Sequence, residues 1–156
     1  MKKLIPFLIS GVLVVGAVGC QTTPKTSADA PNNTNESPKA SDAQSTQSTQ
    51  GDAQSQIRKN QLNSDIRARE QRNNATNGGS ATNRNEGDVG SEVRSKLEAN
   101  IPGGKLAVQN KEGVVTVVGT VPNQQDIAKI QPLAMQIKGV KSVVNKASVA
   151  PAKTKS

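Results

Sequence analysis

Regular hydrophobic patterning in this chain of 156 residues is concentrated between residues 88 and 149. Its first part has apolar residues at a spacing of four, namely Val89, Val93, Leu97 and Ile101. This spacing predicts an amphipathic helix over residues 88–100, with Asp88 as its amino-terminal cap. The run Pro102-Gly103-Gly104 is expected to end it.

Two extended segments come next. Residues 105–109 alternate between polar and apolar positions and are predicted to form a strand, and residues 110–113 form a hairpin turn in which Gly113 adopts a positive φ. The valine-rich run at 114–121 predicts a second strand. Alternation turns one set of its side chains inward, Val115, Val117 and Val121. The opposite set is Val114, Thr116, Val118 and Thr120.

A second helix is predicted after Asn123, which is a suitable cap. Its core-facing residues are Ile127, Ile130, Leu133, Ala134 and Ile137. Pro132 is expected to kink this helix, or to divide it into two pieces that meet near Gln131. Gly139 is expected to cap its carboxyl end, and residues 140–149 to form the last strand.

The predicted fold is therefore α+β, a small α-β-β-α-β domain over residues 88–150 with a tail at 151–156. The last strand should run parallel to the second through a right-handed crossover. This gives a mixed three-stranded sheet with two helices on one face. Gly113, Gly119 and Gly139 are interpreted as backbone requirements and not as binding residues.

Residues 20–87 are rich in small polar residues and poor in large apolar ones, which predicts a disordered tether. A flexible chain of that length reaches about 45 Å. Residues 52–72 are a possible exception, because three apolar residues lie among several arginines. One interpretation is a basic amphipathic helix that lies on anionic lipid. The favoured interpretation is a marginal helix that frays in water.

The amino terminus has the features of an export signal. Lys2 and Lys3 precede an apolar run at 4–18, which is shorter than the ~20 residues that a membrane-spanning helix needs. The end of this run, Ala17-Val18-Gly19-Cys20, resembles the bacterial lipobox, although Ala17 stands where Leu is usual. Residues 1–19 are therefore predicted to be a lipoprotein signal peptide and Cys20 the lipidated residue. The alternative is ordinary cleavage after Ala17 that leaves a free thiol. Lipidation is preferred because this is the chain's only cysteine.

Composition excludes several classes of function. The chain has no His, Trp or Tyr, and its one Phe, Phe7, lies in the predicted signal. Imidazole is thus missing as a general base and as a metal ligand, and no aromatic platform exists for stacking nucleic-acid bases. We expect no catalytic residue, metal, cofactor, small-molecule substrate or nucleic-acid partner, and hence no enzyme.

The formal charge is +8, and removal of Lys2 and Lys3 with the signal leaves about +6. Such a bias favours anionic partners, although solubility alone is an equally good explanation.

Residues 88–149 resemble the BON domain (bacterial OsmY and nodulation). The matching features are the turn at 110–113, the strand at 114–121, and the Gly139-Val140 pair with the valines that follow. The resemblance implies a non-enzymatic envelope module that attaches to phospholipid membranes or to other envelope components. Because Gln21 follows the cysteine, where inner-membrane lipoproteins commonly have Asp, an outer-membrane location facing the periplasm is expected.

Two sets of residues are candidates for the contact surface. The first is a set of lysines for anionic phospholipid headgroups, Lys129, Lys138, Lys141 and Lys146. The alternative is that these lysines form a solvated basic face without a binding role. The second set is a docking patch for other envelope proteins on the outer face of the sheet, formed by Val114, Val118 and Val144.

Overall fold

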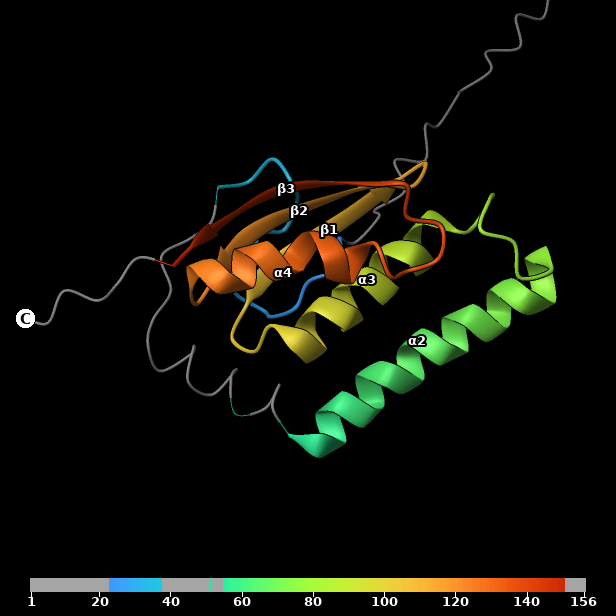
Figure 1. Ribbon diagram of the computed structural model, residues 1–156, viewed down its shortest axis with the longest axis horizontal. Coiled ribbons are helices and arrows are strands. Elements are labelled where there is room, and N and C mark those ends of the chain that lie inside the picture. Colours follow the sequence, from blue (N-terminus) through green and yellow to red (C-terminus); the bar gives the residue numbers. More distant parts are fainter. Residues whose placement is uncertain (1–22, 38–50, 52–54, 151–156) are drawn as a thin grey trace, which may run out of the picture.

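A mixed three-stranded sheet forms the centre of the structure (Figure 1). The computed structural model describes residues 23–37, 51 and 55–150. The strands are β1 (Lys105–Lys111), β2 (Val114–Val121) and β3 (Ser142–Val149), with β2 in the middle. β1 pairs antiparallel with β2, whereas β3 pairs parallel with it. The predicted α+β fold with a mixed sheet is confirmed.

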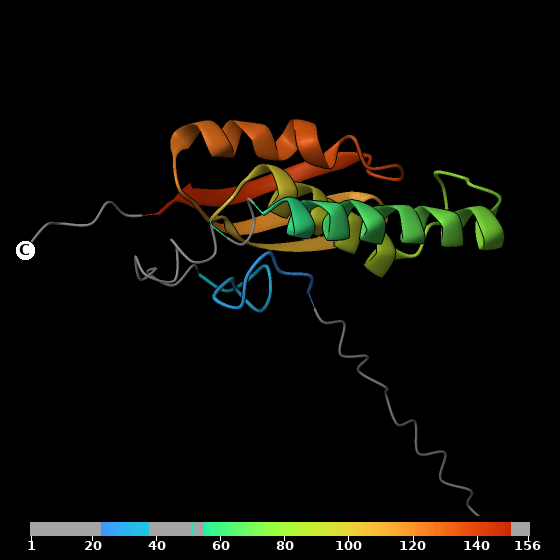
Figure 2. The same ribbon diagram turned by 90° about the horizontal axis from the view of Figure 1, so that it is seen from below.

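Two helices, α3 (Glu86–Asn100) and α4 (Gln124–Ala134), pack with the inner face of this sheet in one hydrophobic core. Figure 2 shows α4 as a layer on one side of the strands. The core is entirely aliphatic and consists of Val89, Val93, Leu97, Ile101, Leu106, Val108, Val115, Val117, Val121, Ile130, Ala134 and Ile137. The inward positions predicted for the central strand thus all lie in the core.

The helix ends differ from the predicted ones. Asn85, and not Asp88, caps α3, because the Asn85 side chain accepts a hydrogen bond from the Asp88 backbone N–H at 3.0 Å. α4 is one helix, and not two pieces that meet near Gln131, since Pro132 lies in its last turn. Met135 caps α4, whereas Gly139, with φ of 94°, lies in the turn before β3.

Parts of the segment predicted to be a tether are folded against the domain. The helix α2 (Gln56–Asn77) is capped by Ser55 at its start and by Gly78 in the left-handed conformation at its end. It packs along α3, and its Leu62 is completely buried. The favoured interpretation of a frayed helix, and the alternative of a helix lying on lipid, both overlooked this packing.

Salt bridges join α2 to α3. Arg58 lies 2.6 Å from Glu98, and Arg69 and Arg72 both contact Asp88, at 3.1 and 2.8 Å. Glu98 and Asp88 are largely buried, which makes these contacts stronger than isolated surface pairs. Three of the four arginines in this segment, all but Arg67, are therefore paired with carboxylates within the protein.

The segment at 23–37 also contacts the domain, along the free edge of β1. Lys25 forms an antiparallel bridge with Ala107, and backbone hydrogen bonds of 2.8 Å run from Thr26 to Leu106 and from Val108 to Pro24. In Figure 2 this segment lies on the opposite side of the sheet from α4. It thus covers part of the face that the helices leave open.

Gly119 and Gly90 offer a matched test of the packing. Gly119 has φ of 125°, and a Cβ there would overlap the carbonyl oxygen of Lys105. Gly90 lies inside α3, where an added Cβ meets nothing closer than Pro24 Cγ at 3.6 Å. We expect Gly119→Ala to lower the free energy of unfolding by about 3 kcal/mol.

Gly90→Ala should instead raise the free energy of unfolding by about 0.5–1 kcal/mol, because alanine favours the helix. Urea denaturation of the two variants and the parent chain measures both effects. Equal stability of the two variants would contradict the close approach of β1 and β2 at Gly119.

Candidate functional site

The outer face of the sheet is divided into a covered half and an open half. β1 lies on the covered side, where residues 23–37 pack over it. Thr26 and Ala30 are buried there, Asp29 pairs with Lys105 at 3.0 Å, and Thr34 donates a hydrogen bond to Gln109. Val118 of β2 is only 3% exposed. The predicted docking patch is therefore wrong at Val118, which is not available to a partner.

The open half carries two valines and three lysines. Val114 and Val144 are each 40% exposed, and Lys111, Lys141 and Lys146 are exposed beside them. We name these five residues the basic outer patch. Among the described residues, none of the salt bridges includes any of these three lysines. The patch therefore presents three lysines outside these salt bridges around a small aliphatic surface.

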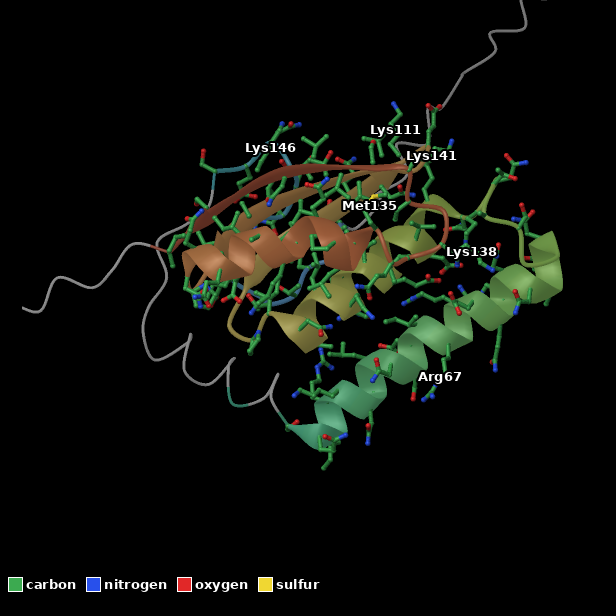
Figure 3. The ribbon with its side chains drawn as sticks, in the orientation of Figure 1. Arg67, Lys111, Met135, Lys138, Lys141 and Lys146 are labelled. Atoms are coloured by element: carbon green, nitrogen blue, oxygen red, sulfur yellow. The ribbon has the colours of Figure 1, made fainter. Side chains whose placement is uncertain are left out.

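Strand register explains why four of these five residues share one face of the sheet. Lys111 is the cross-strand partner of Val114, Val144 is the partner of Thr116, and Lys146 is the partner of Val118. Side chains at alternate positions share a face, so Lys111, Val114, Val144 and Lys146 lie on the outer side. Lys141 precedes β3 and lies at the end of the sheet, next to Gly113. Figure 3 shows Lys111, Lys141 and Lys146 along one border of the domain, with Arg67 on α2 at the opposite border.

The four lysines that the sequence suggested do not form one cluster. Lys141 and Lys146 belong to the basic outer patch. Lys129 pairs with Asp126 at 2.8 Å on α4, and Lys138 donates a hydrogen bond to the carbonyl oxygen of Gly79 (Figure 3 shows Lys138 towards the α2 side). Lys111 was missed, because its place beside Val114 depends on the register of the hairpin.

Two glycines hold the loops that carry Lys111 and Lys141 against each other. The backbone N–H of Lys141 donates to the carbonyl oxygen of Gly113 at 2.8 Å. A Cβ on Gly113 would lie 2.8 Å from the carbonyl oxygen of Gly139, and both glycines have positive φ. Their lack of side chains therefore lets the hairpin turn approach the loop before β3.

A buried ion pair fixes the other side of this loop. Arg84 makes a two-pronged contact with Glu92, at 2.6 and 3.2 Å, and donates a further hydrogen bond to the carbonyl oxygen of Lys138. Both side chains are almost completely buried. Burial raises the pKa of Glu92 above its ordinary value, an effect that Arg84 opposes and that Glu70 and Asp88 reinforce. The pair thus links α3 to the loop that precedes Lys141.

A shallow pocket of about 320 Å³ lies between these loops. Its lining is mostly polar and includes Arg84, Glu86, Asn110, Glu112 and Lys141. An acyl chain needs an apolar cavity, so this pocket does not suit one. Within the described residues no group of three or more His, Cys, Asp or Glu side chains is placed to hold a metal ion.

The comparisons with known proteins concern the same part of the chain. The family model of the BON domain matches residues 85–151. No curated protein matches the chain. None of the helices in the described part of the chain has the length and apolar character needed to cross a bilayer.

The Arg84–Glu92 pair can be tested by removing its members singly and together. Arg84→Met leaves a buried carboxylate without its cation, and we expect a loss of about 3–5 kcal/mol in the free energy of unfolding. The double variant Arg84→Met/Glu92→Leu should recover most of this loss. Lys129→Met, which breaks the exposed pair with Asp126, should cost less than about 1 kcal/mol.

The loss in the free energy of unfolding caused by Arg84→Met should also depend on pH. An acid with a raised pKa holds its proton more tightly in the folded than in the unfolded state, so its contribution is most favourable below the ordinary value of 4.5. That contribution is lost as the pH rises through the folded pKa. Denaturation curves across this range should show the variant approach the parent in acid, and a constant deficit would contradict the assignment to Glu92.

Proposed function

Because the chain contains a BON domain at residues 85–151, a module associated with phospholipid membranes, we propose that it is a lipid-anchored envelope protein whose basic outer patch contacts anionic membrane surfaces. The observation that carries this proposal is the juxtaposition of Lys111, Lys141 and Lys146 with two half-exposed valines. The proposed role is attachment, without catalysis.

The patch suits a lipid surface for two physical reasons. Each basic residue near an anionic bilayer contributes on the order of 1 kcal/mol. Val114 and Val144 add apolar area that is removed from water when the patch meets the headgroup region. Such a contact is weak and salt-sensitive by itself, because it relies on three exposed charges.

The proposed anchor makes a weak contact sufficient. Lipidation of Cys20 would keep the protein at the membrane, since each buried CH₂ contributes about 0.8 kcal/mol. The anchor then raises the effective concentration of the patch at the surface. Gln21 after the cysteine favours the periplasmic face of the outer membrane as the location.

One observation favours docking to another envelope protein as a second candidate. β3 is an edge strand of the sheet, and it carries Val144 and Val149 partly exposed. An open edge can pair with an extended segment of a partner. Such a partner would be recognised by backbone hydrogen bonds, so its binding should depend little on the three lysines.

A vesicle-binding experiment separates the two candidates. The mature chain with Cys20→Ser is mixed with vesicles of phosphatidylglycerol and phosphatidylethanolamine at low salt and sedimented. The triple variant Lys111→Gln/Lys141→Gln/Lys146→Gln should lose about 3 kcal/mol of binding free energy, or roughly a hundredfold in affinity.

The matched control is Lys59→Gln/Arg67→Gln/Lys96→Gln, which removes the same charge from α2 and α3. It should lower the affinity only a few-fold, through the net charge. Equal losses in both triple variants would show that the patch has no special role. Indifference of the parent chain to anionic vesicles would favour the protein partner.

The anchor has its own test in cells. Cys20→Ser should move the protein from the membrane to the soluble fraction, whereas Thr22→Ser should leave it in the membrane. Mass spectrometry of the mature protein should find an amino-terminal Cys20 that carries diacylglycerol. An unmodified peptide that begins at Val18 would contradict lipid anchoring.

A further inference from the structure

Resting on the proposed function, we infer that residues 23–37 strap the domain to the vicinity of its lipid anchor and turn the basic outer patch toward the bilayer. The strap replaces the long flexible tether that the sequence suggested. The membrane-facing orientation of the domain is then built into the fold.

The direction of the strap is the first step. Its antiparallel pairing places Lys25 opposite Ala107 and Pro24 next to Val108. Residues before Pro24 in an antiparallel pair correspond to residues after Val108 in β1. The amino-terminal end of the strap therefore points toward Lys111, at the end of the sheet that carries Val114 and Lys141.

Chain length is the second step. Pro24 is four positions after Cys20, and a fully extended chain spans at most about 3.5 Å per residue, or ~14 Å. Lys111 is three residues from Val108, or ~10 Å along the strand. A lipid on Cys20 is therefore confined to the neighbourhood of the patch, whereas a free tether would allow about 45 Å.

The strap is fastened by specific contacts. The Thr26 hydroxyl donates to the carbonyl oxygen of Gly104 at 2.7 Å and accepts from the backbone N–H of Leu106 at 2.8 Å, and Thr26 is buried. Beyond Thr26, the Asp29–Lys105 pair continues the contact across the outer face. These bonds join residues far apart in sequence, so the position of the strap is set by the folded domain.

The absence of tryptophan from the chain permits a clean reporter experiment. The full lipidated protein with Val114→Trp is reconstituted into vesicles of phosphatidylglycerol and phosphatidylethanolamine with brominated acyl chains. Contact with the bilayer should quench the fluorescence of this tryptophan. Gln125→Trp, at the start of α4 and the opposite end of the sheet, should be quenched much less.

Two variants release the strap in the Val114→Trp background. Thr26→Pro removes the N–H and the hydroxyl that bind Leu106 and Gly104, and Ala28→Pro is its control at an exposed position. Insertion of a flexible Gly/Ser stretch after Thr22 lengthens the link to Cys20 without touching the folded part. Both Thr26→Pro and the insertion should lose roughly half or more of the quenching, because a longer link dilutes the patch at the surface.

The inference is overturned if Thr26→Pro or the insertion variant retains the quenching of the parent. It is also overturned if Ala28→Pro loses as much quenching as Thr26→Pro. An unquenched Val114→Trp in a protein that still sediments with the vesicles overturns it as well. Failure of the lipidated parent to associate with vesicles at all would instead overturn the proposed function, and with it the inference.

Discussion

Both α3 and α4 pack on the same face of the three-stranded sheet, so the helices cover only one of its two faces. The inner face is therefore sealed by aliphatic side chains from α3 and α4, while the outer face must be covered by other parts of the chain or left in water. Residues 23–37 cover the half that belongs to β1. The remaining half, on β3 and the end of the hairpin, holds the basic outer patch. The proposed contact surface is thus the part of the outer face that residues 23–37 do not cover.

Salt bridges within the protein determine which positive charges remain free to attract an anionic partner. Three arginines of α2 form salt bridges with carboxylates on α3, and Arg84 is buried with Glu92. A mature chain with a net charge of about +6 would otherwise attract anions from every side. Most of the arginine charges are matched, so the positive charge outside these salt bridges is carried mainly by lysines, among them Lys111, Lys141 and Lys146. Net charge alone favoured an anionic partner but did not indicate which surface would contact it.

Short-range patterns were predictable, and long-range contacts were not. Spacing of four and of two residues identified α3, β1 and β2, since these periods reflect which side of one element meets the core. The predicted exposure of Val118 was wrong because its cover comes from residues 23–37, far earlier in the chain. α2 was undervalued for the same reason, since its stability depends on Glu98 and Asp88 of another helix. Lys111 required the hairpin register, which the sequence indicates only through its turn.

The strap also determines which part of the amino-terminal region sets the distance between the lipid anchor and the patch. Residues 38–54 connect two segments, the strap and α2, that are both held against the domain. The number of residues in this connection therefore does not change the length of chain between Cys20 and the patch. The effective concentration of the patch at the membrane falls as the chain between the patch and the anchor becomes longer. A segment whose two ends are both fixed to the domain is not part of that chain. A low-complexity sequence at those positions is thus compatible with a domain held close to the bilayer in one orientation.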